Sequence, residues 1–281
     1  MKTVKGCLTI LADNTVTGKV EGLGEHGFSV YIEIDTGNYL FDTGWGKTIV
    51  YNAVVYKKTL GALDKIILSH GHPDHTGGLP EVLRFYDQID VLGHPDIFLH
   101  RFRKEVESKR EYGGIPYIRG YLEKMGARFV FNRDFVEMEK GIYLTGEVPR
   151  ETDFEVGDLD NRYGIRDGKV VPEIILDDQS LIIKTEGGIL ILLGCAHSGI
   201  INIINHAIKM TGVDTIFGIV GGTHLGFSGQ EQLEKTILAL KAYHIKHFIP
   251  GHCTGIAAAN RLSREFGKIF QFSHVGMAFD F

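Results

Sequence analysis

Three histidines and an aspartate fall within six consecutive positions, as His70, His72, Asp74 and His75. Neutral imidazoles and carboxylates are ligands suited to zinc, iron or manganese. Side chains this close together along the chain cannot all reach one ion comfortably, so their spacing favours two neighbouring ions. A loop that is merely polar would seldom carry so many histidines beside an apolar strand. The run therefore predicts a site for two divalent metal ions.

The flanking segments indicate how these ligands are positioned. Residues 64–68 are typical of a short buried strand, and Gly77 and Gly78 lead into a helix that begins near Leu79. The ligands then lie on a strand-to-helix loop, where α/β proteins usually form their sites. Three later segments, 194–199, 221–225 and 250–255, have the same form of a strand followed by a glycine-bounded loop with a histidine.

Strand-like and helix-like segments occur in both halves of the chain. We expect strands at 7–12, 28–34, 38–41, 65–68, 89–92, 129–131, 136–138, 142–144, 180–184, 188–193, 215–220 and 247–250, and helices at 49–60, 200–210 and 230–243. No repeat, low-complexity tract or Pro/Ser-rich linker divides the sequence. Residues 1–281 are therefore expected to form a single domain.

The segment near 98–124 differs because charges of both signs alternate along it between residues 101 and 111. Such a run is typical of a solvated helix stabilised by i,i+4 charge pairs. It could instead form a helical lid whose Arg and Tyr side chains contact an anionic or aromatic substrate. Both interpretations predict a helical insertion in the domain.

Composition limits the classes of function. With 43% hydrophobic and 23% charged residues, the chain of 281 residues is typical of a globular protein. A net charge of -5 favours neither nucleic acid nor an anionic membrane, so we expect a small-molecule substrate and neither of these partners; homo-oligomer formation stays open. Three cysteines far apart indicate a reducing compartment, and the absence of a signal sequence or of an apolar run of about 18 residues predicts a cytoplasmic protein.

The pattern His70-x-His72-x-Asp74-His75 resembles the signature of the metallo-β-lactamase superfamily. The resemblance implies an α/β (α+β) fold, a four-layer αββα sandwich with two mixed β-sheets. It implies that His70 and His72 bind one ion and that Asp74 and His75 bind the second. His252, in its Pro-Gly-His context, would complete the second ion's ligands.

The third ligand of the first ion has several candidates. His197 is the leading one, but alignment with the common superfamily pattern places this ligand near Asp178 and a bridging carboxylate at Cys195. Either His197 or Asp178 could bind the first ion, while Cys195 is a bridging ligand or an inert buried thiol. A thiolate ligand would favour a softer ion such as zinc, which we expect over iron or manganese.

Two other residues have expected roles near the ions. Asp42 closes a strand as Phe-Asp-Thr-Gly, similar to a superfamily motif in which the carboxylate supports the metal loop. His224 is a ligand, a substrate contact or a plain structural histidine. We expect Asp74 and His224 to be the catalytic groups.

Metal chemistry makes hydrolysis the first functional expectation. A metal ion lowers the pKa of bound water from about 15.7 to about 7, so hydrolysis of a small ester, lactone or phosphoester is expected. His72 excludes the superfamily's flavodiiron branch, which has Glu at this position.

A closer resemblance gives a second expectation. Motifs such as Glu25-His26-Gly27-Phe28-Ser29 and Gly221-Gly222-Thr223-His224-Leu225 look like a subfamily that includes the archaeal enzyme joining a dihydropterin methyl group to ribofuranosylaminobenzene 5'-phosphate with loss of pyrophosphate. This implies a transferase with a pterin-like, anionic substrate. The third alternative is a metal or redox sensor that uses Cys195 without turnover.

Overall fold

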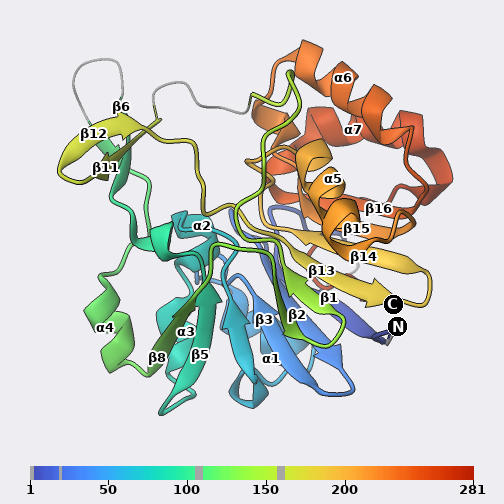
Figure 1. The fold of residues 1–281 in the computed structure, drawn as a ribbon. Coiled ribbons are helices and arrows are strands. Elements are labelled where there is room, and N and C mark those ends of the chain that lie inside the picture. The colour runs from blue at the N-terminus through green and yellow to red at the C-terminus, as the bar shows by residue number, and fades with distance from the viewer. Residues whose placement is uncertain (1–2, 19–20, 105–109, 157–161) are drawn as a thin grey trace.

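The computed structural model describes residues 3–18, 21–104, 110–156 and 162–281, and Figure 1 shows two large sheets packed face to face between helices. The first sheet has the order β17 (Ala278–Asp280), β1 (Gly6–Ala12), β2 (Ser29–Ile34), β3 (Gly37–Phe41), β4 (Lys65–Ile67), β5 (Ile89–Gly93) and β8 (Ala127–Phe131). The second has the order β16 (Ile245–Gly251), β15 (Ile216–Gly222), β14 (Gly188–Leu193), β13 (Leu181–Thr185), β10 (Ile142–Leu144) and β9 (Val136–Glu139). Both sheets are mixed, because each combines parallel pairs with antiparallel hairpins.

Helices cover the outer faces of both sheets. On the first sheet lie α1 (Ile49–Val55), α3 (Leu79–Leu83) and α4 (Arg119–Lys124), and on the second lie α5 (Ile200–Thr211), α6 (Gln230–Leu240) and α7 (Ile256–Phe266). The short helix α2 (Pro73–Thr76) follows β4, and the 3-10 turns are η1 (Leu60–Ala62), η2 (Pro95–Phe98), η3 (Leu225–Phe227), η4 (His252–Thr254) and η5 (Gly267–Ile269). No helix in the described part of the chain is long and apolar enough to cross a membrane.

The alternation of side chains along β14 explains the layering. Ile189, Ile191 and Leu193 belong to the apolar cluster beneath α5, whereas Leu190 and Leu192 belong to the cluster between the two sheets. Successive side chains of a strand point to opposite faces, so an uninterrupted apolar strand is buried on both sides. The run of isoleucine and leucine in β14 therefore places it at the centre of the molecule.

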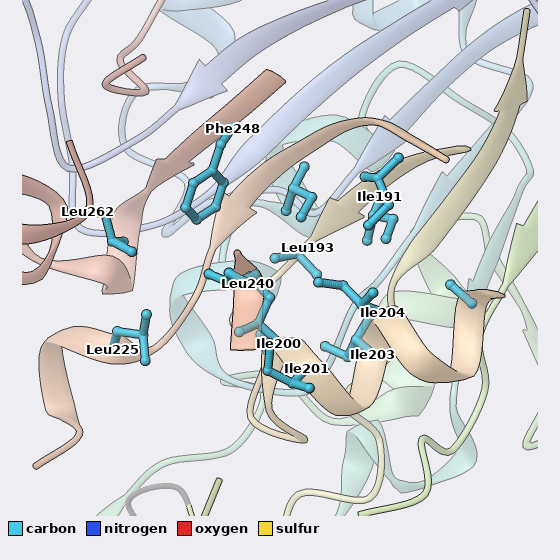
Figure 2. Packing of buried hydrophobic residues seen from close by; sticks show 14 of the residues in the cluster. Ile191, Leu193, Ile200, Ile201, Ile203, Ile204, Leu225, Leu240, Phe248 and Leu262 are labelled. Atoms are coloured by element: carbon cyan, nitrogen blue, oxygen red, sulfur yellow. The ribbon is translucent and has the colours of Figure 1, made fainter. Parts of the chain in front are cut away.

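Helix α5 seals the outer face of the second sheet. Its residues Ile200, Ile201, Ile203 and Ile204 are buried at helical spacing. Figure 2 shows these side chains directed towards those of β14. A corresponding cluster under α1, α3 and α4 completes three apolar layers. The four-layer αββα sandwich with two mixed sheets is thus confirmed.

A smaller antiparallel sheet corrects the expectation for the charged segment. It has the order β12 (Lys169–Pro172), β11 (Arg162–Arg166), β6 (Arg101–Lys104) and β7 (Arg110–Tyr112), and we call it the accessory sheet. The expected helical lid is therefore wrong for residues 101–104 and 110–112, although α4 is helical; residues 105–109 lie outside the described part. Phe102 pairs with Tyr112 and with Tyr163 across the strands. These cross-strand aromatic contacts outweigh the weak i,i+4 charge pattern.

Candidate metal centre

Loops from both large sheets meet at one edge of the sandwich. Asp42 follows β3, and the residues from Ser69 to His75 follow β4, which runs parallel to β3. Cys195 and His197 follow β14, His224 follows β15, which is parallel to β14, and His252 follows β16, which is parallel to β15. Because the carboxyl ends of parallel strands lie on the same edge of a sheet, loops far apart in sequence are brought together there.

His70, His72 and His197 form the first ligand group. Their ligand atoms lie within 4.8 Å of one another, and His70 Nε2 is 2.9 Å from His72 Nδ1. Burial, reinforced by the neighbouring positive groups, holds the pKa of all three imidazoles well below its usual value. They are consequently neutral near pH 7, which is the form of imidazole that binds metal ions.

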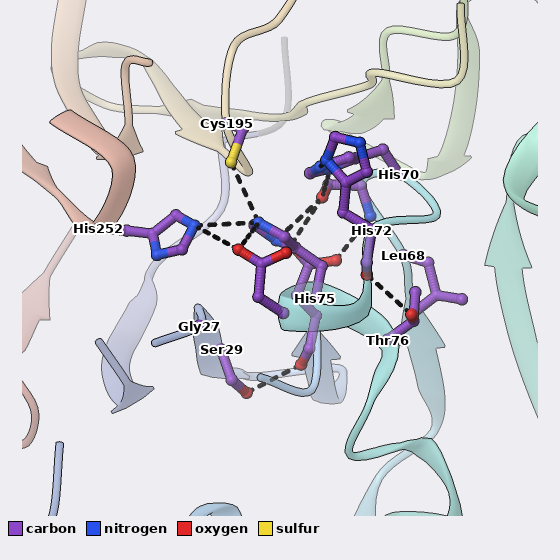
Figure 3. A network of polar contacts seen from close by, with 12 residues as sticks. Gly27, Ser29, Leu68, His70, His72, His75, Thr76, Cys195 and His252 are labelled. Carbon is purple, nitrogen blue, oxygen red and sulfur yellow. Dashed lines mark hydrogen bonds and ion pairs between the residues drawn. The ribbon is translucent and has the colours of Figure 1, made fainter. Parts of the chain in front are cut away.

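Asp74, His75 and His252 form the second group. Asp74 Oδ2 lies 3.2 Å from His252 Nε2 and 3.8 Å from His75 Nε2, and the two imidazole Nε2 atoms are 3.2 Å apart. Figure 3 shows His75 between Cys195 and His252, with His70 and His72 to one side. Burial alone would raise the pKa of Asp74, but the interactions with His75 and His252 outweigh it and hold that pKa well below its usual value. Asp74 is thus a carboxylate.

Hydrogen bonds behind the imidazoles fix their orientation. Asp42 Oδ2 is 2.7 Å from His75 Nδ1, and Ser69 Oγ lies 2.8 Å from His70 Nδ1. Ser69 also donates to Asp42 from its hydroxyl and its backbone N–H. Because Asp42 contacts His75 from behind, its placement agrees with the supporting role expected from the sequence. Such contacts set the tautomer and the direction of a ligating imidazole.

Cys195 lies between the two groups. Its Sγ is 3.1 Å from His75 Nε2. The same atom belongs to three ligand groups, one with His70 and His75, one with His197 and His224, and one with His252 and Cys253. Burial raises the pKa of the Cys195 thiol. The sulfur therefore lies between the two ligand groups, and burial favours its protonated thiol form.

The structure separates the candidates for the remaining ligand. His197 joins His70 and His72, whereas Asp178 accepts a hydrogen bond from Ser198 N at 2.8 Å and belongs to none of the ligand groups found among the described residues. His224 is adjacent, with its ring centroid 4.2 Å from that of His197.

His26 is a neighbour of the site that sequence reasoning missed. Its Nε2 lies 3.3 Å from Asp74 Oδ2, and it forms a further group with Asp74 and His252. Asn14 contacts both histidines, with Oδ1 2.9 Å from His252 Nδ1 and Nδ2 3.2 Å from His26 Nδ1. The only sequence signal was the motif Glu25-His26-Gly27, which resembled the subfamily without indicating a role.

The donors present fit divalent metal ions. Zinc binds imidazole nitrogen at about 2.0–2.1 Å in tetrahedral geometry, which separates neighbouring ligand atoms by roughly 3.4 Å. The spacings within both groups are compatible with this value. In the first group, buried neutral imidazoles whose nitrogens lie so close together otherwise gain little, since a shared proton satisfies only one such contact.

Strained backbone is concentrated in the same loops. Asp42, Ala196, His224 and His252 all have positive φ, and they are four of the seven described non-glycine residues that do. This conformation is unfavourable for residues with a Cβ atom and persists where the surroundings enforce it, commonly at functional sites.

A cavity of about 310 Å³ opens over the ligand groups. Its floor includes His72, Asp74, Cys195 and His197, and the accessory sheet supplies one wall. Aromatic side chains line it, namely Trp45, Phe102, Tyr112, Tyr163 and Phe227. Trp45 and Phe227 are 43% and 56% exposed, so large apolar surfaces stand open to solvent at this cavity. The arrangement suits a planar ring held close to metal ions.

Comparison with known proteins agrees with this geometry. The sequence model of the metallo-β-lactamase superfamily matches residues 22–202. A Methanocaldococcus jannaschii protein named 7,8-dihydropterin-6-methyl-4-(β-D-ribofuranosyl)-aminobenzene-5'-phosphate synthase is 34% identical, covering 92% of this chain and 90% of its own. An uncharacterised protein of the same organism is 35% identical, covering 96% and 98%.

Solved structures show the same fold. A crystal structure described as a metal-dependent hydrolase of the β-lactamase superfamily has a TM-score of 0.82 at 26% identity and covers 98% of both chains. A metallo-β-lactamase fold protein from Bacillus subtilis, at 11% identity, has a TM-score of 0.60, covering 99% of this chain and 100% of its own.

Proposed function

The chain belongs to the metallo-β-lactamase superfamily, and on that premise we propose that it is a metal-dependent transferase that joins a dihydropterin methyl group to an arylamine. The observation that carries the proposal is the cavity, which combines aromatic walls with a floor of two metal-ligand groups. The name of the relative that is 34% identical over 92% of this chain describes the product of such a reaction.

His70, His72 and His197 are the proposed ligands of one ion, and Asp74, His75 and His252 those of a second. Imidazole, carboxylate and the adjacent Cys195 thiol together favour zinc. When bound, such ions act as Lewis acids that stabilise negative charge developing on a leaving group.

The proposed reaction replaces a diphosphate by an amine. The C–O bond between the pterin methylene and the diphosphate breaks with its electron pair leaving on oxygen, and the arylamine nitrogen forms the new C–N bond and loses a proton. His224, whose ring lies beside that of His197 and lines the cavity, is the proposed acceptor of this proton. The aromatic walls hold the pterin ring and exclude water from the methylene carbon.

Hydrolysis is the second candidate, and the 26% identical structure described as a metal-dependent hydrolase favours it. With water as nucleophile, the same site would release an alcohol instead of the condensed amine. Small phosphoesters, esters and lactones are then the substrates to compare.

One assay separates the two candidates. The zinc-loaded protein is incubated with the dihydropterin methyl diphosphate, with and without aminobenzene ribofuranoside 5'-phosphate, and the products are identified by mass spectrometry. The transferase predicts condensed pterin and pyrophosphate only when the amine is present, whereas hydrolysis predicts the hydroxymethyl pterin in both cases. Absence of condensed product under all metal conditions would rule out the transferase.

His197→Ala is expected to lower either activity at least a hundredfold, because it removes a ligand of the first ion. His244→Ala is the matched control, since His244 is an exposed histidine that belongs to none of the ligand groups found among the described residues. Equal activities of these two variants would contradict the assignment of His197.

A further inference from the structure

A row of four charged residues crosses the accessory sheet. Arg103 of β6 lies directly opposite Arg162 of β11, and Glu111 of β7 lies opposite Arg103 on its other side. Beyond Arg162, Glu173 donates its backbone N–H to Arg162 O at 3.1 Å. All four residues line the cavity above the ligand groups.

The centre of this row places two positive charges side by side. Residues directly opposite on neighbouring antiparallel strands project from the same face, and like charges at such positions destabilise the pairing. Glu111 lies opposite Arg103 in the strand register, whereas the Glu173 carboxylate accepts from Ile175 N and lies 3.8 Å from Arg166 Nη2.

This pair of arginines stands beside the first ligand group. Arg162 Nη1 lies 3.4 Å from His72 Nε2, and the Arg162 side chain is half-buried, whereas that of Arg103 is exposed. A group held by Arg162 thus lies beside His72, one of the proposed ligands of the first ion. Arg103 reaches the same space from the solvent side.

A third arginine of the sheet has a different role and fixes the position of the first two. Arg101 is buried and donates from Nη1 and Nη2 to the Asp177 carboxylate at 3.0 and 2.8 Å. Asp177 also accepts the N–H of Gly71, between His70 and His72, at 2.7 Å. The accessory sheet is therefore connected directly to the metal-binding loop.

We propose that Arg103 and Arg162 together bind a phosphate group of the substrate, so that the accessory sheet selects phosphorylated compounds for the metal centre. Guanidinium groups present planar forks of N–H donors that match phosphate oxygens in bidentate geometry. An anion between the two arginines removes their mutual repulsion. The inference rests on the proposed function only for the identity of the compound that carries the phosphate.

Phosphate affinity can be measured without turnover. Trp45 is the single tryptophan and lines the cavity, so its fluorescence should report binding of phenyl phosphate to the zinc-loaded protein. Arg162→Gln and Arg103→Gln are each expected to weaken this binding by about tenfold to a hundredfold, the range for a charged hydrogen-bonding contact. Arg162→Lys should retain part of the affinity because it keeps the charge.

The control is Arg128→Gln, which removes an exposed arginine that pairs with Asp90 and does not line this cavity. It should leave phenyl phosphate affinity unchanged. Circular dichroism and thermal unfolding of each variant show whether the accessory sheet still forms; folded Arg→Gln variants with wild-type affinity would overturn the proposal. The proposal would also be overturned if phenyl phosphate binding disappeared on metal removal but was unchanged by both arginine substitutions, because the ions alone would then hold the anion.

Kinetics identify which phosphate is bound. If the site holds the leaving diphosphate, Arg162→Gln raises KM for the pterin substrate, and if it holds the 5'-phosphate, the variant raises KM for the arylamine. If no condensed product forms but phenyl phosphate still binds in a way that depends on the arginines, the proposed function is refuted and the phosphate site is retained. Condensation with both KM values unchanged in Arg162→Gln refutes the phosphate site alone.

Discussion

Cys195 occupies the place where one ligand could contact two ions. Its sulfur is 3.1 Å from His75 Nε2 and belongs to groups on both sides of the site. A thiolate ligand gives a bound cobalt(II) ion an intense charge-transfer absorption in the near ultraviolet. We predict that the cobalt-substituted protein shows this absorption and that Cys195→Ser removes it, as measured by absorption spectroscopy during cobalt titration.

Cys253 is the comparison for that experiment, because it is the other thiol in a ligand group with Cys195 and His252. Its Sγ accepts the N–H of His224 at 3.3 Å and lies 3.7 Å from the carbonyl oxygen of Cys195, so backbone contacts already engage it. Cys253→Ser should keep the absorption. A band that survives in Cys195→Ser would show that Cys195 is an inert buried thiol, and the sensor hypothesis would then lose its only feature.

The ligands differ in how far sequence could predict them. His70, His72, Asp74 and His75 were recognisable because their spacing within one loop is itself the signal. The choice between His197 and Asp178 was not, since it depends on which loop turns towards β4. In the structure Asp178 is used to hold Ser198 N, leaving His197 beside the other imidazoles.

At the scale of elements, Asp96 joins three parts of the fold. It lies in η2 after β5, and its carboxylate accepts from Arg166 Nη1 of β11 at 2.6 Å and from Arg133 Nη2 at 3.1 Å. Burial alone would raise the pKa of Asp96, but the pairing with Arg166 and Arg133 outweighs it and lowers that pKa. The carboxylate is therefore more acidic in the folded than in the unfolded chain.

The lowered pKa of Asp96 stabilises the fold at pH values above the pKa of an aspartate in the unfolded chain, about 3.9. This contribution is lost as the pH falls through the pKa that Asp96 has in the folded protein. We predict that Asp96→Asn lowers the free energy of unfolding by about 1–3 kcal/mol at pH 7. The difference from the wild type should shrink at pH 3, as measured by urea unfolding at both pH values. Asp87→Asn, at an exposed aspartate, should change the free energy of unfolding little at either pH. If the loss of stability in Asp96→Asn persisted unchanged at pH 3, charge pairing would be ruled out as its cause.

Helices and strands were predictable where a single pattern of hydrophobic residues dominated the sequence. Strand β14 and helix α5 followed from continuous apolar character and from helical spacing. Strands β6 and β7 did not, because the sequence from Arg101 to Tyr112 supports charge pairs along a helix as well as alternation along a strand. The aromatic partner that decides between them, Tyr163, lies on β11 and is distant in sequence.

At the scale of the whole molecule, both sheets contribute proposed ligands to the same site. His70, His72, Asp74 and His75 follow β4 of the first sheet, whereas His197 and His252 follow β14 and β16 of the second. Three apolar clusters hold the layers together, but the loops that carry the ligands bring buried imidazoles into mutual contact at the edge. An ion bound by these side chains would therefore link the two sheets at a place where apolar packing does not.

This arrangement predicts that metal binding stabilises the whole fold rather than one loop. A ligand that binds only the native state adds RT ln(1 + [L]/Kd), about 4 kcal/mol when the free ion is at a thousand times its Kd. Treatment with a chelator should therefore lower the Tm of the wild-type protein in a single cooperative transition, as measured by calorimetry. His252→Ala removes a ligand contributed by the second sheet and should lose much of the difference between the metal-loaded and chelated forms, whereas His244→Ala should keep it. If His252→Ala retained the full difference, His252 would not be a ligand, and its part in linking the two sheets through the second ion would have to be abandoned.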